Sequence, residues 1–264
     1  IVHRVTRVTQ SDMSELDRMA QALVPLKDLA EAKTRLAGVL RPTQRRALAQ
    51  AMVEDVLSVL SAHPQVGRVT LVSDDPCASL LATRYAIDCW SEQSLDGARG
   101  LNSVVRAASE RLLARATGPL LVLHADLPLL SGGDISAVLR RQAVSRGLVI
   151  ACDRHGTGSN VLAFNNASMP RFCFGADSCL RHLAVARDAG FPATVMRRPG
   201  TAIDVDDARD IAALLQVYAL PPGGRASTRT ADLLNSDGLG ARLARTLATL
   251  AQADAVPGES EAQQ

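Results

Sequence analysis

The sequence predicts an α/β fold in which a mostly parallel, mixed central sheet carries helices on both faces. Two observations support this prediction. Short, continuous apolar runs bounded by polar or charged residues recur along the chain, and segments with helical spacing of apolar residues lie between them. Continuous apolar strands are typical of a sheet that is buried on both faces, and strands that alternate with helices are typical of a parallel sheet.

The individual elements are predicted from their apolar pattern and from the residues that end them. The predicted strands are 22–26, 69–73, 87–90, 120–124, 148–152, 161–164 and 194–196. After Pro42, apolar side chains recur on one helical face as far as Leu60, and Pro64 stops this helix. Further helices are predicted at 101–115, 134–146, 178–189 and 207–216.

The chain is predicted to contain one folded domain, 21–218, with an extension at each end. Residues 1–20 are expected to form a disordered leader, within which Met13 or Met19 is a candidate native start. Residues 219–264 are expected to comprise a Pro-Pro-Gly-Gly linker, one further helix at 239–250 and a flexible tail.

Composition argues against several classes of protein. The formal net charge is +2 and aromatic residues make up 3% of the chain, so no basic surface with interleaved stacking residues for nucleic acid is predicted. No apolar run reaches the length of a membrane span, and no signal peptide is recognisable. The five cysteines are odd in number and widely separated, which argues against a disulfide framework or a structural zinc site. We expect a cytoplasmic protein that acts on small molecules.

A loop after the first predicted strand carries three cations, Lys27, Lys33 and Arg35. In an open parallel sheet, ligands bind beyond the carboxyl ends of the strands, so this loop is a candidate site. Fixed cations there could clamp a triphosphate and stabilise charge on the transferred group and on the leaving pyrophosphate. The same spacing also fits a solvated helix start.

Three aspartates form a candidate Mg²⁺ site. Asp126 comes just after a predicted strand, and Mg²⁺ prefers carboxylate and phosphate oxygens. In an extended segment, Asp204 and Asp206 project to the same side and can face one cation. Each residue also has a structural alternative: Asp126 as a turn or cap residue, and 204–207 as the capped start of the next helix. His124 is interpreted as a core or edge histidine rather than as a ligand.

Two glycine-rich turns, at 96–102 and 156–160, offer backbone N–H groups to an anion, although many such turns bind nothing. Neither matches the G-x-G-x-x-G or Walker A pattern, which counts against NAD-binding and P-loop proteins. No G-x-S-x-G nucleophile elbow occurs. A direct transfer to an acceptor that supplies its own phosphate oxygen needs no protein nucleophile.

Taken in order, these residues resemble the 2-phospho-L-lactate guanylyltransferase family of coenzyme F-420 biosynthesis, whose members are similar to compact sugar-nucleotide pyrophosphorylases. The most specific part is P-L-K-x-L-A-E-A-K-T-R-L at 25–36. Supporting motifs follow at 71–74, 100–102, 124–128, 156–162, 174–178 and 203–206. The resemblance implies a Rossmann-like nucleotidyltransferase fold of the nucleotide-diphospho-sugar transferase type. It also implies Mg²⁺-dependent transfer of GMP from GTP to a small phosphorylated carboxylic acid, with release of pyrophosphate.

Carried over residue by residue, the resemblance gives each candidate an expected role. The expected catalytic residues are Asp126, Lys33 and Arg35, and the expected metal ligands are Asp126, Asp204 and Asp206. The nucleotide is expected to contact Pro25, Lys27, Lys33, Arg35, Ser73, Asp74, Gly100 and Asn102. The phosphorylated acid is expected to contact Ser159, Asn160, Gly175 and Ser178, with a helix N-cap as the alternative role of Ser178.

The resemblance leaves three acceptors open: 2-phospho-L-lactate, phosphoenolpyruvate and 3-phospho-D-glycerate. We favour 3-phospho-D-glycerate, because Arg154, His155 and His182 could meet a carboxylate set farther from the phosphate. A homodimer and a downstream deazaflavin transferase are the expected protein partners. The alternatives are a sugar-phosphate or molybdopterin nucleotidyltransferase, a dinucleotide-dependent oxidoreductase and a non-catalytic nucleotide-binding regulator.

Overall fold

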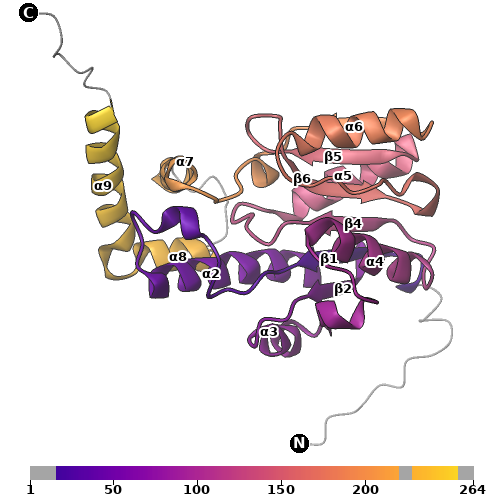
Figure 1. The fold of residues 1–264 in the computed structure, drawn as a ribbon, viewed down its shortest axis with the longest axis horizontal. Coiled ribbons are helices and arrows are strands. Elements are labelled where there is room, and N and C mark those ends of the chain that lie inside the picture. The colour runs from indigo at the N-terminus through magenta and orange to yellow at the C-terminus, as the bar shows by residue number, and fades with distance from the viewer. Residues whose placement is uncertain (1–15, 220–227, 255–264) are drawn as a thin grey trace, which may run out of the picture.

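The computed structural model describes residues 16–219 and 228–254. Within them lies a seven-stranded sheet of order β3-β2-β1-β4-β6-β5-β7 (Figure 1). The strands are β1 (Ala20–Pro25), β2 (Val66–Val72), β3 (Asp88–Trp90), β4 (Leu120–Leu123), β5 (Leu148–Cys152), β6 (Ser159–Phe164) and β7 (Ala193–Met196). Neighbouring strands are parallel except where β6 pairs antiparallel with β4 and β5. The predicted mixed, mostly parallel sheet is confirmed.

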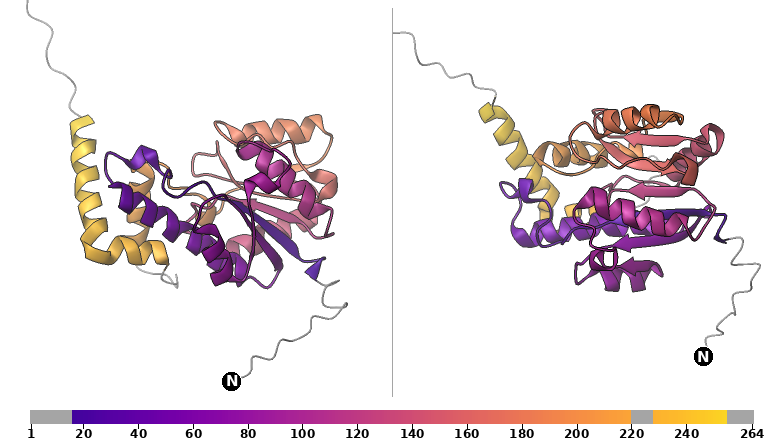
Figure 2. Two further views of the ribbon diagram at one scale, coloured as in Figure 1. Left: turned by 60° about the horizontal axis from the view of Figure 1, so that its bottom comes forward. Right: turned by 45° about the vertical axis from the view of Figure 1, so that its right-hand side comes forward.

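Helices cover both faces of the sheet (Figure 2). One face packs against α2 (Pro42–Ser61), α3 (Ala78–Tyr85) and α5 (Gly132–Ser145). The other packs against α4 (Leu101–Leu113) and α6 (Ser178–Asp188). Side chains alternate along β1, so Ala22 and Val24 enter the first core while Leu23 enters the second.

A third apolar cluster lies beyond the sheet, where the start of α2 meets α7 (Ala208–Ala219), α8 (Arg229–Asn235) and α9 (Leu239–Asp254). We call it the outer cluster. Its buried members are Leu36, Leu40, Leu48, Met52, Ile203, Val205, Ile211, Leu214, Leu234, Leu239 and Leu243. Figure 1 shows α8 beside α2 and α9 standing at the end of the molecule.

The extensions differ from their prediction. Asp17 accepts backbone hydrogen bonds from Thr117 and Gly118, and a Cβ at Gly118 would lie 1.9 Å from the carbonyl oxygen of Met19. The last residues of the expected leader therefore pack against the domain. After the linker the structure has two helices where one was expected, because α8 is too short to show a helical period in the sequence. For the same reason α3 was missed.

Some predicted segments fall outside the described residues: the candidate start Met13, the linker 221–224 and the residues after 254. Among the residues that are described, no helix combines the length and the hydropathy that a bilayer crossing requires.

Candidate active site

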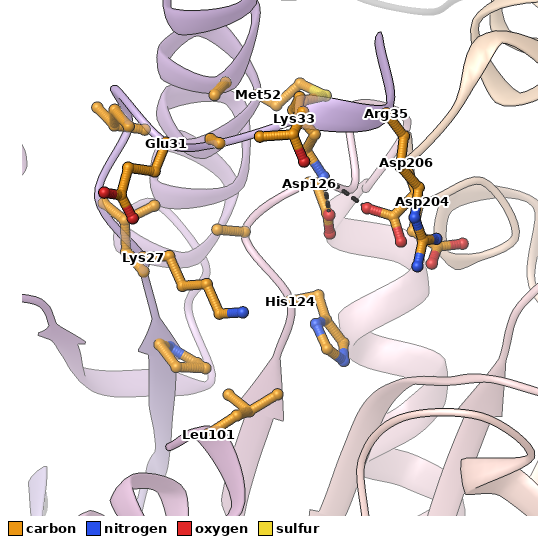
Figure 3. Close-up of a pocket in the computed structure, with 17 residues that line it drawn as sticks. Lys27, Glu31, Lys33, Arg35, Met52, Leu101, His124, Asp126, Asp204 and Asp206 are labelled. Carbon is orange, nitrogen blue, oxygen red and sulfur yellow. Dashed lines mark hydrogen bonds and ion pairs between the residues drawn. The ribbon is translucent and has the colours of Figure 1, made fainter. Parts of the chain in front are cut away.

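A cavity of about 400 Å³ opens at the carboxyl ends of β1 and β4, where open α/β sheets bind their ligands. Seven of the predicted site residues line it: Pro25, Lys27, Lys33, Arg35, Asp126, Asp204 and Asp206. Figure 3 shows Lys27 and Lys33 reaching into it from the loop after β1, with Asp126 directly below Lys33. We call residues 27–35 the cation loop and the three aspartates the carboxylate group.

Lys33 connects the cation loop to the carboxylate group. Its Nζ lies 2.9 Å from Oδ1 of Asp206 and forms a second, shorter ion pair with Asp126 (Figure 3). Burial disfavours the charged amine, but the two carboxylates outweigh this effect and raise the pKa of Lys33. Lys33 has φ 58°, a left-handed conformation that costs a non-glycine residue of the order of 1 kcal/mol. The loop holds Lys33 in this conformation, with its side chain over the aspartates.

The carboxylate group has the chemistry of a cation site. Burial opposes ionisation of Asp126, yet the ammonium group of Lys33 holds the pKa of the Asp126 carboxyl below its ordinary value. Burial, and next the negative charge of Asp126, raise the pKa of Asp204. Oδ1 of Asp126 is buried without a hydrogen-bond partner. Hard oxygen ligands of this kind suit Mg²⁺.

The carboxylates are not preassembled into a complete metal centre. Within 16–219 and 228–254, no three Asp, Glu, His or Cys side chains are grouped closely enough to hold a metal ion. Lys33 stands between Asp126 and Asp206, and Oδ1 of Asp204 accepts a hydrogen bond from Asn160 at 3.1 Å. The oxygen donors of Asp126, Asp204 and Asp206 would suit a hard cation such as Mg²⁺.

Asp75, which the sequence analysis did not select, anchors the cation loop. Its carboxylate is buried and accepts hydrogen bonds from the backbone N–H of Leu29 and of Cys77, each at 2.7 Å. The sequence does place Asp74 and Asp75 together after β2. It cannot tell which one turns inward, because that depends on how the loop after β1 packs.

Four residues predicted to contact the nucleotide do not line the cavity. Three of them have hydrogen-bond partners within the protein. The hydroxyl of Ser73 accepts from Asp75 N–H, and Asp74 accepts from Glu92 N–H. Asn102 forms two hydrogen bonds with the backbone of Phe174, of 2.7 and 3.3 Å. Gly100 precedes α4 at φ 77°, and a Cβ there would meet nothing within 4 Å. Their contacts with the nucleotide stay predictions.

The structure brings together the two turns predicted to hold the acid, 156–160 and 174–178, which we call the paired turns. The hydroxyl of Ser178 accepts from Ser159 N–H at 2.9 Å, and Cys179 N–H donates to Thr157 O at 2.8 Å. Ser159 and Ser178 are buried, whereas Gly175 is exposed.

Two predicted side chains of the paired turns have structural partners. The N-cap residue of α6 is Asp177, so the N-cap alternative for Ser178 is wrong. Asn160 is buried and donates to Thr201 O at 2.9 Å as well as to Asp204. Direct contact of Ser178 or Asn160 with the acid stays a prediction.

The three side chains that favoured 3-phospho-D-glycerate have hydrogen-bond or ion-pair partners within the protein. His182 is fully buried between Ser159 Oγ and the backbone N–H of Cys173, and burial lowers its pKa to about 4. It is therefore neutral near pH 7. Arg154 forms an ion pair with Asp210 at 2.8 Å and donates to His155. The reason given for that acceptor is wrong for His182; for Arg154, whose Nη1 is buried without a hydrogen-bond partner, it stays a prediction.

His124 has a larger place in the site than the sequence indicated. It lines the cavity half-buried and packs edge-on against Phe174, with ring centroids 5.2 Å apart. Its backbone N–H donates to Asn160 O. Met52 and Leu101 supply apolar wall, a role that no sequence signal separated from ordinary core packing.

The sheet topology and its covering helices are a fold of the nucleotide-diphospho-sugar transferase type. A solved structure from Desulfovibrio desulfuricans, described as a nucleotide-diphospho-sugar transferase, matches with a TM-score of 0.71 at 18% identity, over 87% of this chain and 98% of that one. A 4-diphosphocytidyl-2C-methyl-D-erythritol synthase matches at TM-score 0.53 and 15% identity, over 76% of this chain and 98% of that one.

The chain belongs to the family described as guanylyl transferase CofC like, whose model matches residues 20–218. It is 37% identical to a phosphoenolpyruvate guanylyltransferase of Conexibacter woesei, over 79% of this chain and 92% of the relative. It is also 37% identical to a phosphoenolpyruvate guanylyltransferase of Sphaerobacter thermophilus, over 72% and 89%. The protein is thus a nucleotidyltransferase of the guanylyltransferase kind, which confirms the predicted family.

Proposed function

We propose that the protein transfers GMP from GTP to phosphoenolpyruvate and releases pyrophosphate. The observation that carries the proposal is the cavity of about 400 Å³, because Lys27, Lys33 and Arg35 line it together with the carboxylate group. Phosphoenolpyruvate replaces 3-phospho-D-glycerate as the favoured acceptor for two reasons. His182, which favoured the latter, is buried and neutral, and relatives at 37% identity bear the phosphoenolpyruvate name.

In this proposal the cation loop holds the triphosphate. Lys27 and Arg35 are exposed cations on its rim, and Lys33 is the cation nearest the carboxylate group. Asp126, Asp204 and Asp206 would hold Mg²⁺, which when bound neutralises charge on phosphate oxygens. The anchored backbone at Leu29 keeps the cations in place before the substrate arrives.

The reaction needs positioning and charge stabilisation rather than a protein nucleophile. A phosphate oxygen of the acid forms a bond to the α-phosphorus of GTP, and the bond from that phosphorus to the bridging oxygen of pyrophosphate breaks. Lys33 and Arg35 stabilise the charge that develops on the transferred and leaving groups. The backbone at Gly100 has open space around it, which favours close approach of the nucleotide. Gly175 is exposed, which favours close approach of the phosphorylated acid.

The wider setting is part of the same proposal. The product would serve as the donor for a downstream deazaflavin transferase in coenzyme F-420 biosynthesis, in the cytoplasm, and the enzyme would act as a homodimer. The sequence resemblance and the family membership support the pathway. The homodimer is carried over from the sequence analysis alone.

A product assay tests the proposal. The protein is incubated with GTP, Mg²⁺ and one of phosphoenolpyruvate, 3-phospho-D-glycerate or 2-phospho-L-lactate, while pyrophosphate is followed and the product is identified by mass. We expect the fastest transfer with phosphoenolpyruvate, and little transfer when ATP replaces GTP. A faster reaction with either other acid would overturn the acceptor, and pyrophosphate release without a guanylylated acid would overturn the transfer itself.

A further inference from the structure

Both halves of the candidate active site rest on the outer cluster. Leu36 directly follows Arg35 in the short 3₁₀ helix Thr34–Leu36 and is fully buried. Val205, also fully buried, stands between Asp204 and Asp206. Leu36 and Val205 therefore fix the backbone on either side of the charged residues, and they pack in one cluster with Leu234 of α8 and Leu243 of α9.

The two halves are also joined to each other by polar contacts. Val205 N–H donates to the backbone carbonyl of Asp126 at 3.3 Å, and Lys33 spans from Asp126 to Asp206. A shift of Leu36 relative to Val205 would change the spacing between the cations and the carboxylates. Errors of about 1 Å in such spacing can cost about a hundredfold in rate.

The helix pair α8–α9 is fixed to the domain independently of the cavity. The carboxylate of Asp55 in α2 accepts the backbone N–H groups of Arg229 and Thr230 at 2.7 and 3.0 Å. Glu54, the adjacent residue, forms an ion pair with Nε of Arg229 at 2.9 Å. These contacts satisfy the first N–H groups of α8 and seat it on α2.

The packing of α9 is close. A Cβ at Gly240 would lie 2.8 Å from the carbonyl oxygen of Leu234 and 3.3 Å from Leu215 of α7. Glycine is what permits α9 to approach α8 and α7 at this point. Leu239 and Leu243 lie on either side of Gly240 in the same helix and are both nearly fully buried in the outer cluster.

We propose that α8–α9 is a positioning element for guanylyl transfer, which holds the cation loop and the carboxylate group in register through Leu36 and Val205. None of the described side chains of α8 and α9 lines the cavity, so the pair acts through these two side chains and is not a binding wall. The family model matches residues 20–218, and α8–α9 lies beyond them. The inference rests on the proposed function, because it concerns the geometry of the same reaction.

The test compares three Leu→Ala variants of the whole chain. Leu243→Ala removes a side chain that is 2% exposed from the outer cluster. Leu112→Ala removes one of similar burial, 3% exposed, from the core under α4, and controls for lost stability alone. Leu250→Ala changes an exposed leucine of α9 itself. The melting temperature of each variant is measured first. The kcat and the KM for GTP are then measured well below that temperature.

We expect Leu243→Ala to lower kcat/KM for GTP roughly tenfold through misplaced catalytic groups. Leu112→Ala should melt earlier with unchanged kinetics, and Leu250→Ala should change neither. Trypsin cleavage at Lys33 and Arg35, identified by mass spectrometry, should become faster only in Leu243→Ala. This second measurement needs no substrate, so it reports on the positioning element even if the wild-type protein transfers nothing and the proposed function fails.

The inference would be overturned if Leu243→Ala melts at a lower temperature but keeps wild-type kinetics and wild-type cleavage of the cation loop. If Leu243→Ala does not fold, Leu243→Val replaces it, since it disturbs the same packing less severely. The same two readouts, compared with Leu112→Ala, then decide.

Discussion

The cavity region, made of the cation loop and the carboxylate group, and the paired turns were both predicted to hold ligands, yet their polar groups differ in how far they are hydrogen-bonded. In the first region the charges face a cavity, and one carboxylate oxygen of Asp126 is buried with no partner. In the second, Ser178 bonds to Ser159, Ser159 bonds to His182, and Asn160 bonds to Thr201. We interpret the unpartnered oxygen in the first region as a ligand-binding group and the satisfied network in the second as structural support.

The largest expected effect is on the cavity side. Asp126→Asn should lower kcat by about 10²- to 10³-fold with little change in melting temperature, because it removes the charge that pairs with Lys33 and would hold Mg²⁺. Steady-state kinetics and thermal melting measure the two quantities. Asp188→Asn, at an exposed site at the end of α6, is the matched control and should leave kcat unchanged. A near-wild-type rate for Asp126→Asn would end the contrast between the two regions.

The next effect concerns His182, at the centre of the satisfied network. Its pKa in the native state is about 4, below the ordinary 6.5, so the unfolded chain takes up the proton first as pH falls. The contribution of His182 to the free energy of unfolding is therefore complete above pH 6.5. It falls by about 3 kcal/mol as the pH drops to about 4. Denaturant unfolding between pH 4 and 8 measures the loss.

His182→Phe is the comparison for that titration. It should be less stable at pH 7 but show a flatter decline toward pH 4, since the titrating group is gone. A wild-type profile that does not fall between pH 6.5 and 4 would contradict the buried neutral histidine.

A smaller effect is expected in the cation loop itself. Lys33→Met and Arg35→Met should each raise KM for GTP roughly tenfold, because a hydrogen bond to a charged group contributes about 1.5 kcal/mol. Both should also slow transfer. Arg140→Met, an exposed change on α5, provides the control. Unaltered kinetics in both loop variants would show that the cation loop does not bind the nucleotide.

The smallest effect separates support from binding in the paired turns. Ser178→Ala leaves the buried N–H of Ser159 without its acceptor, at a cost of about 1 kcal/mol, or about 2–4 °C in melting temperature. KM for the acid should change little. A large rise in that KM with an unchanged melting temperature would instead place the hydroxyl of Ser178 on the substrate.

The sequence predicted most of the fold, because the apolar pattern of a strand or an amphipathic helix can be recognised within the segment itself. Strand β5 (148–152) was predicted with its observed bounds, while the short helices α3 and α8 were missed. For the site, the sequence selected the aspartates by their position after strands. It missed Asp75 and underrated His124, since both owe their place to neighbours distant in the chain.

What the sequence by itself determined is the chemistry that is available: a run of cations after β1, acids after β4 and near the end of the domain, and the motif order of a guanylyltransferase. Only the tertiary structure decided which of these groups remain unsatisfied. The hydroxyl of Ser178 and the carboxylate of Asp126 look equally available in a sequence. In the folded protein the hydroxyl of Ser178 accepts a hydrogen bond from a buried N–H, whereas one carboxylate oxygen of Asp126 has no partner. Hydrogen-bond partners depend on contacts across the sheet and not on neighbours along the chain.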